Sequence, residues 1–332
     1  MEIISLTSLY RRRLQELKDV GITPKTFKAN NFDFKRTFAD FTKDGNLIHD
    51  EVLGFRRLID NERLVNRQVK DLKAKSNGSE GTFRYIVPLP QNSPDCNALR
   101  NILVSIQKES KMKDTFIQTS KTETFEAIDD YLNTMEGKFN LVLDMEMKYR
   151  DFSRLVDKYI KKCNEIVLLY KDWTKNKRNV NFIITKALEY PEKLHMAFIP
   201  INLYARGGDL ISTLLICSGF KSVSFEDSEF PRYMLKHIKK GNEKTPIEKL
   251  SNCQWCNPNL MCFEKGHKKD CMCLSESTTK LLKKVKFQNI VTFHNLEVLY
   301  ASYLDIKRKP QFKEKVLNLE SMQSLKKNLR LT

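Results

Sequence analysis

The stretch FNLVLDMEMKYRDFSRLVDKYIKKCNEIVLLYKDW, which covers residues 139–173, contains the pattern that decides the fold class. It begins and ends with short apolar runs, FNLVLDME and EIVLLYKDW, which are typical of buried β-strands. The stretch FSRLVDKYIKKC between them is amphipathic with the spacing of an α-helix. A helix that connects two such strands indicates a parallel pair, so we predict an α/β fold built on a parallel sheet.

The alternation of strand and helix continues on both sides of this unit. The other runs predicted as strands are FRYIVPLP, DTFIQTS, VNFIITKAL, HMAFIPINLYA and KSVSFED. The other predicted helices are CNALRNILVSIQKES, TFEAIDDYLNTM and GGDLISTLLICSGF. Seven strands in roughly 145 residues fit either a (β/α) barrel or a doubly wound sheet, and the pattern alone does not distinguish the two. No Walker-type or G-x-G-x-x-G loop is present, so a nucleotide cofactor has little support.

The composition and charge indicate a folded protein that binds a polyanion. The chain has 332 residues, 41% of them hydrophobic, which is enough for one large domain or one domain with an extension. Its net charge of +17 favours nucleic acid as the partner over an acidic membrane surface, which charge alone also allows. The segment from Lys236 to Thr332 has 20 basic and 9 acidic residues, a net +11, so we expect this end to meet phosphates.

Three regions differ in composition. Residues 1–80 are rich in basic residues and read as helices, for example LYRRRLQELKDV and NERLVNRQVKDLKAK, and SNGSEGT at residues 76–82 is typical of a flexible connector. We predict a helical, basic N-terminal extension over residues 1–80, a (β/α) domain over residues 81–250, and a cysteine-rich, basic C-terminal segment over residues 251–332. The charges of the extension fit a solvated helical face or an arm that contacts nucleic acid. No apolar run approaches the roughly 20 residues of a membrane span and no secretory signal is evident, so we expect a cytoplasmic protein.

Polar residues fall where several of the predicted strands end. This edge of a parallel α/β sheet is where catalytic residues gather. An aspartate at such a position is also a common helix cap, so each acid has a structural interpretation beside the catalytic one. The candidates are Asp144, Asp172, Lys186, the run Arg206, Gly207, Gly208 and Asp209, and the pair Glu226 and Asp227.

Five of the eight cysteines lie between Cys253 and Cys273, in the stretch CQWCNPNLMCFEKGHKKDCMC. Cys253 and Cys256 form a C-x2-C pair, which can offer two thiolates to one ion. The other candidate ligands in the stretch are Cys262, His267, Cys271 and Cys273. In a chain without an export signal this crowding favours a zinc site over a set of disulfides. Downstream, TFHNLEVLYASYLDIKR reads as a helix with His294 near its start.

The C-x2-C pair followed by HNL resembles the C-terminal zinc element of the tRNA-guanine transglycosylases. The pattern of that family is C-x-C-x2-C with a later histidine ligand in HNL, and here SNCQWC has Ser251 where the first cysteine would stand. The resemblance implies one structural Zn²⁺ held by Cys253, Cys256 and His294, with a loop cysteine as the fourth ligand. Cys262 is the first choice because it is nearest, and Cys271 and Cys273 remain open alternatives.

The end of KSVSFED carries a second part of the resemblance. In this family the nucleophilic aspartate lies at a strand end in a stretch like F-D-C-V-x-P, and FEDSEFP has Asp227 four residues before Pro231, the same offset. DSEFPRY is similar to the looser version found in the DNA 7-deazaguanine transglycosylases of phages and bacterial islands. HMAFIPINLYARGGDLISTLLICSGF is similar to the strand, glycine turn and helix that precede the nucleophile. The resemblance covers about residues 139–308.

The resemblance implies a TIM-like (β/α) barrel with a zinc-binding element, in which Asp227 is the covalent nucleophile. The family has a second aspartate in a D-S-G-G-F-Q-like motif that contacts the incoming base, and no such string is present here. Asp144 is the positional counterpart, with a Met-Glu pair after it instead of small residues. The implied substrate-binding residues are Arg206, Gly207, Gly208 and Arg232, with Lys236 as a further phosphate contact.

The implied activity is exchange of guanine in DNA for a 7-deazaguanine base of the preQ0 type, in the cytoplasm of a bacterial or phage-infected cell. We expect DNA rather than tRNA because DSEFPRY looks closer to the DNA-modifying relatives and because the basic extension has no counterpart in the compact tRNA enzymes. Two other interpretations stay open: a tRNA-guanine transglycosylase, and a zinc-stapled nucleic-acid-binding protein without catalysis.

Overall fold

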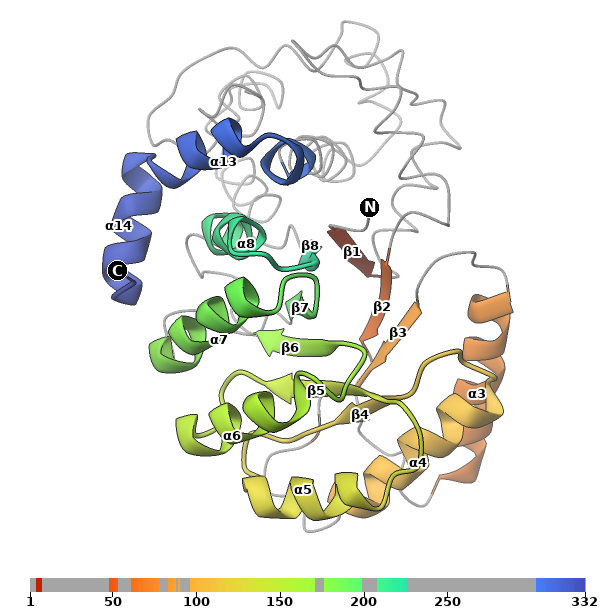
Figure 1. Cartoon of the computed structure of the whole chain (residues 1–332). Helices are drawn as coiled ribbons and strands as arrows, with labels where there is room; N and C mark the ends of the chain where they lie inside the picture. The colour runs from red at the N-terminus through yellow and green to blue at the C-terminus, as the bar shows by residue number, and fades with distance from the viewer. Residues whose placement is uncertain are drawn as a thin grey trace, which may run out of the picture.

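The structure is a computed structural model, which describes residues 4–7, 48–52, 61–77, 83–87, 89, 96–170, 176–198, 208–225 and 303–331. Within these ranges, eight strands form one sheet in the order β3-β2-β1-β8-β7-β6-β5-β4, and every neighbouring pair is parallel (Figure 1). The predicted parallel α/β fold is therefore confirmed. The strands are β1 (Ile4–Thr7), β2 (Ile48–Val52), β3 (Phe83–Ile86), β4 (Phe116–Gln118), β5 (Asn140–Asp144), β6 (Ile166–Tyr170), β7 (Leu194–Phe198) and β8 (Ser222–Phe225).

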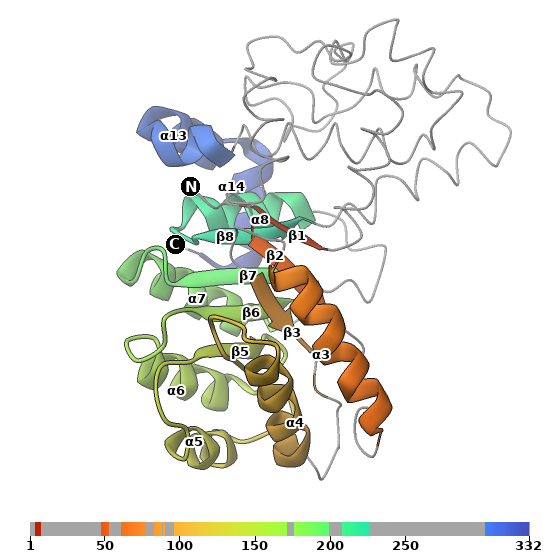
Figure 2. The same cartoon turned by 90° about the vertical axis from the view of Figure 1, so that its right-hand side faces the viewer.

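Helices connect the strands and cover one face of the sheet (Figures 1 and 2). From β4 onward a single helix follows each strand as far as α8, and the C-terminal helices α13 and α14 pack against α8 and α7. The helices are α3 (Glu62–Asn77), α4 (Cys96–Glu109), α5 (Phe125–Asn133), α6 (Tyr149–Tyr159), α7 (Lys177–Glu189), α8 (Gly208–Cys217), α13 (Pro310–Leu317) and α14 (Glu320–Leu329). The helices predicted at α4, α5, α6 and α8 are confirmed.

The prediction of a strand at VNFIITKAL is wrong, because these residues belong to α7. Its buried side chains are Val180, Ile183, Ile184 and Ala187, which follow the i, i+3, i+4, i+7 spacing of one helical face. The β-branched residues suggested a strand, but their period is helical and packing outweighs propensity here. Lys186 therefore does not end a strand. It lies in the last turn of α7 and pairs with Asp157 and Glu189.

The sheet begins earlier in the chain than the sequence predicts. Residues 1–80 were expected to form a helical extension, and α3 fits that expectation, but β1 and β2 are strands of the main sheet. β1 pairs with both β2 and β8, so it joins the first and last parts of the sheet. Removing the residues before Ser76 would therefore delete two strands of the sheet rather than a separable arm.

The first and last strands in this order, β3 and β4, are linked by the side chain of Gln118. Gln118 of β4 donates from Nε2 to the carbonyl oxygen of Tyr85 (2.9 Å) and accepts from the backbone N–H of Val87 (3.2 Å). In a flat sheet, strands seven places apart would be separated by roughly 34 Å, at about 4.8 Å per strand. The sheet must therefore curl until β3 and β4 lie side by side, which is compatible with a TIM-like barrel.

Alternation along the strands separates an inner face from an outer face. Tyr85 of β3 and Val87, the residue after β3, pack against α3 and α4, whereas Ile86 between them belongs to a different cluster. Since successive side chains of a strand point to opposite faces, this second cluster lines the inside of the curled sheet. Its members are Ile86, Phe116, Val142, Val167, Leu169 and Ala197. The largest cluster fills the space between β5–β8 and the helices outside them.

Candidate active site

Asp144 lies at the C-terminal end of β5 and shares the inner face of the sheet with Val142. Its side chain is 4% exposed, and its Oδ1 accepts a hydrogen bond from the backbone N–H of Glu146 (2.8 Å). The carboxylate therefore stabilises the turn after β5, as the capping interpretation predicts. A buried acid at the carboxyl edge of a parallel sheet is also placed as a catalytic acid would be, so the two roles are compatible.

Two asparagines hold the turn after Asp144 in place. Asn179 of α7 donates from Nδ2 to the carbonyl oxygens of Met145 and Met147, at 2.9 Å each. Asn176 donates to the same Met145 oxygen (3.2 Å) and has a left-handed backbone (φ 54°), which asparagine tolerates better than most residues. The start of α7 is thereby fastened to the chain that follows β5.

A further contact links this turn to the end of β4. Lys121 donates from Nζ to Glu146 Oε2 (2.8 Å), and the Thr119 hydroxyl donates to the carbonyl oxygen of Val142 (2.9 Å). The chain segments after β4, β5 and β6 are therefore joined by polar contacts around Asp144. Such cross-links favour a rigid edge, as a site that positions substrate requires.

The other predicted site residues are placed only in part. Gly208 is the first residue of α8, and β8 ends at Phe225, two residues before Asp227. In parallel strands the carboxyl ends share one edge, so Asp144 and the end of β8 lie at the same edge, with β6 and β7 between them. The remaining predicted residues lie outside the described ranges: Asp172, Arg206, Gly207, Glu226, Asp227, Arg232, Lys236, Cys253, Cys256, Cys262, His267, Cys271, Cys273 and His294.

A buried polar cluster, which the sequence did not reveal, occupies the opposite end of the sheet. Arg84 donates from Nε to Glu165 Oε1 (2.7 Å) and from Nη1 to Ser222 Oγ (3.3 Å). His195 places Nδ1 2.7 Å from Ser222 Oγ and Nε2 2.7 Å from Glu165 Oε2, although the second contact lacks hydrogen-bond geometry. We call these four residues the Arg84 cluster. They come from the beginnings of β3, β6, β7 and β8.

The charges of the Arg84 cluster compensate one another. Burial opposes ionisation of Glu165, but Arg84 and His195 outweigh it and hold the pKa of this carboxyl below its usual range. Burial, aided by Arg84, lowers the pKa of His195 to about 3, so its ring is neutral at neutral pH. Arg84 can only donate to Nδ1 of His195, which it contacts, so the ring proton is on Nε2.

The Ser-His-Glu contacts resemble those of a hydrolytic triad, but their position argues for a structural role. Arg84, His195 and Ser222 are fully buried, and they lie at the amino ends of the strands, where (β/α) folds keep residues that stabilise them. Arg84 crosses from β3 to β6, five places away in the strand order, so it also holds the curled sheet together. One polar residue at the start of each apolar run was the only sequence signal.

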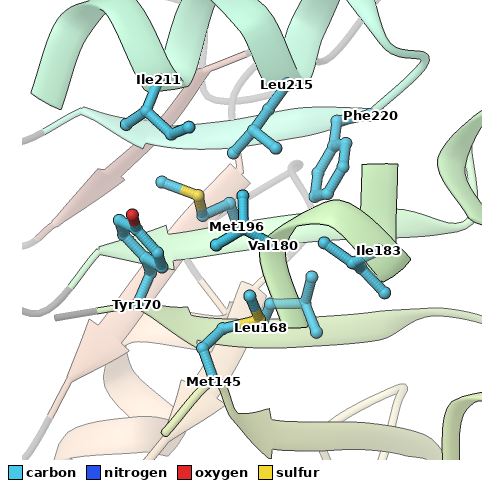
Figure 3. Close-up of a pocket in the computed structure, with 9 residues that line it drawn as sticks. All are labelled: Met145, Leu168, Tyr170, Val180, Ile183, Met196, Ile211, Leu215 and Phe220. Carbon is cyan, nitrogen blue, oxygen red and sulfur yellow. The ribbon is translucent and has the colours of Figure 1, made fainter. Parts of the chain in front are cut away.

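The pocket in Figure 3 belongs to the hydrophobic core rather than to a site. It lies between the outer face of β5–β7 and the helices α7 and α8, and all of its lining residues are core side chains. The lining has no charged side chain that could bind or activate a substrate. The residues are Met145, Leu168, Tyr170, Val180, Ile183, Met196, Ile211, Leu215 and Phe220.

The cysteines of the described ranges are buried in the core. Burial raises the pKa of the Cys163 and Cys217 thiols to about 12, which disfavours the thiolate that metal binding or nucleophilic attack requires. Within the described ranges, no group of three or more His, Cys, Asp or Glu residues could hold a metal ion. All four predicted zinc ligands fall elsewhere in the chain.

Comparison with known proteins gave no relative: no protein-family model and no curated protein matches the chain. Among the helices that the structure describes, none has the length and apolar character needed to span a membrane.

Proposed function

We propose that the protein is a nucleic-acid guanine transglycosylase, built on a (β/α) barrel, that exchanges guanine in DNA for a 7-deazaguanine base of the preQ0 type. The observation that supports this best is the position of Asp144. It is a buried, inward-facing acid at the carboxyl edge of a curled parallel sheet, the edge at which β8 ends two residues before Asp227. Base exchange requires two acids with separate tasks, and in this proposal Asp144 is one of them and Asp227, two residues after the end of β8, is the other.

In the proposed reaction, a carboxylate oxygen of Asp227 attacks C1′ of the target nucleotide. The bond between C1′ and N9 of guanine breaks, and the departing base takes up a proton at N9. The nitrogen of the incoming 7-deazaguanine then loses its proton, attacks C1′ and releases the Asp227 carboxylate. Asp144 would carry the proton between the two bases, which is a general acid–base role worth typically 10²–10⁴-fold in rate.

Zinc has a structural role in this proposal. Cys253, Cys256, Cys262 and His294 supply three sulfurs and one nitrogen, which is the donor set of a closed tetrahedral site. Bound there, the metal would fasten the cysteine-rich stretch to the segment that carries His294. Metal analysis should find about one zinc per chain, and Cys256→Ser should remove it and destabilise that segment, because binding of a structural metal is coupled to folding.

The substrate is proposed to be DNA. A target base in a duplex must be flipped out of the stack, at a cost of a few kcal/mol that contacts to the flanking backbone offset. Arg206, Arg232 and Lys236 are the proposed contacts on the C-terminal side of the chain, with Gly207 and Gly208 allowing close approach of the base.

An incubation with labelled guanine or 7-deazaguanine, and with DNA and tRNA in parallel, tests the proposal. We expect label in DNA, and we expect Asp227→Asn to abolish labelling while nucleic-acid binding persists, since an amide fits the same space but does not attack C1′. Full activity of that variant would assign the attack to Glu226 or exclude the enzyme. Labelling of tRNA alone would change the substrate, and binding without any exchange would leave a non-catalytic nucleic-acid-binding protein.

A further inference from the structure

Five exposed residues gather beside Asp144, where α6 and α7 begin. Arg178 lies with its guanidinium carbon 5.7 Å from the ring centre of Tyr149, so the two helix ends are in contact. The Tyr149 ring also meets Phe182 edge-on, at 6.0 Å between ring centres. We define the α6–α7 patch as Lys148, Tyr149, Arg150, Lys177 and Arg178, all of which are exposed.

The patch concentrates positive charge, and the acid that its Arg150 influences, Glu126, is already paired with Arg154. None of its four cations forms an ion pair with any residue in the described part of the chain. The nearest acids in sequence are engaged: Glu146 pairs with Lys121, and Asp151 is buried and accepts from the N–H of Phe125. Elsewhere on α6, by contrast, Arg154 and Lys158 pair with acids of α5.

The position of the patch relative to Asp144 is fixed by covalent and polar links. Lys148 is four residues along the chain from Asp144, so the two α-carbons are at most about 14 Å apart. Asn176 and Asn179 fasten the start of α7 to Met145 and Met147, within the same turn. A ligand on the patch would therefore be held at a defined distance from the carboxylate.

We propose that the α6–α7 patch binds the backbone of single-stranded DNA, with an unpaired base stacked on Tyr149. Four exposed cations, none of them in an ion pair with a described residue, match phosphates, and an exposed aromatic ring among them matches an unstacked base. A membrane surface fits less well. Among the described residues the large exposed hydrophobic side chains are Tyr149 and Leu188, and Leu188 lies at the far end of α7, away from the patch. The role of the patch in binding the substrate strand rests on the proposed function, since Asp144 must act on that same strand.

Fluorescence anisotropy with a labelled DNA oligonucleotide, recorded over a range of salt concentrations, tests the patch directly. Lys148→Ala/Arg150→Ala should weaken binding on the order of tenfold and reduce the salt slope by about 1.4, at roughly 0.7 for each phosphate contact to a single strand. The matched control is Lys161→Ala/Lys162→Ala, which removes the same charge from exposed residues at the other end of α6. That control should bind like the wild type.

Tyr149→Ala should weaken binding at least fivefold, whereas Tyr149→Phe, which keeps the ring, should retain it. Equal effects of the two double variants, or no effect of either, would overturn the proposal, as would binding of RNA alone or of anionic vesicles in place of DNA. Binding is measured without base exchange, so the outcomes separate. If the chain binds DNA through the patch but shows no base exchange, only the proposed function is contradicted. If base exchange occurs and the patch variants bind DNA like the wild type, only the patch proposal is contradicted.

Discussion

The two ends of the curled sheet differ in the surroundings of their charged side chains. At the amino ends of the strands, the Arg84 cluster buries a cation, an anion and a neutral imidazole in mutual contact. At the carboxyl ends, the four cations of the α6–α7 patch are exposed beside the buried Asp144 and form no ion pair within the described part of the chain. At the amino ends the loss of one partner would leave a buried charge at a high cost in stability, whereas at the carboxyl ends the exposed cations are available to a ligand.

The largest effect should come from breaking the compensation at the amino end. Glu165→Gln removes the carboxylate that Arg84 contacts at 2.7 Å in a buried environment, so we expect the free energy of unfolding to fall by about 3–5 kcal/mol in chemical denaturation. The double variant Arg84→Met/Glu165→Gln removes both charges and should recover part of that loss. Equal stability of Glu165→Gln and wild type would show that the cluster does not hold the sheet together.

At the carboxyl end, a change of charge should affect activity instead of stability. Asp144→Asn keeps the acceptor for the N–H of Glu146 but removes the ionisable group, so base exchange should fall by about 10² or more at an almost unchanged melting temperature. Asp144→Ala, which also loses the acceptor, should reduce both. An Asp144→Asn variant with full exchange activity would leave Asp144 with its capping role alone.

Two glycines near the amino end allow backbone strain to be separated from steric contact. Both have a left-handed backbone, φ +103° at Gly219 and φ +84° at Gly137, but only at Gly219 would a Cβ lie 2.8 Å from a carbonyl oxygen, that of Ala187. We expect Gly219→Ala to destabilise the fold by about 2–3 kcal/mol and Gly137→Ala by about 1 kcal/mol. Equal losses, measured by thermal unfolding, would mean that the contact with α7 adds nothing.

The smallest expected effect is a dependence of stability on pH, caused by His195 at the amino end of the sheet. Because the folded pKa of His195 is about 3 and its unfolded value is about 6.5, the unfolded state binds more protons between these values, and stability falls as the pH is lowered. From pH 6 to pH 5 the loss should approach 1.4 kcal/mol per unit. His195→Asn should flatten this slope, and an unchanged slope would place its origin in other groups.

The comparison also shows what the sequence could predict. The helices at α4, α5, α6 and α8 and the parallel sheet follow from local periodicity, and Asp144 was identified because its strand end is visible in FNLVLDME. α7 was mistaken for a strand because its β-branched residues were weighed above their helical spacing. β1 and β2 were missed because they are short apolar runs among many charged residues, which resemble turns of a helix. Their strand partners are also distant in sequence.

The Arg84 cluster could not be predicted for a different reason. Its members lie in four segments between residues 84 and 222, and they meet only because the sheet curls. The α6–α7 patch, in contrast, uses two short runs at the starts of adjacent helices, so its charge is visible in the sequence. Its position beside Asp144 depends on the contacts that the asparagines at the start of α7 make, and no sequence motif predicts these contacts.

The amide of Gln118 has a consequence for association between molecules. Among the described residues no backbone ladder joins β3 to β4, so both strands are edges of the strand order, and edge strands are the places where sheets can pair with another chain. Gln118 occupies the carbonyl of Tyr85 and the N–H of Val87 on one of these edges. Loss of the Gln118 amide would therefore loosen the seam between β3 and β4 and expose an edge that could pair with another copy.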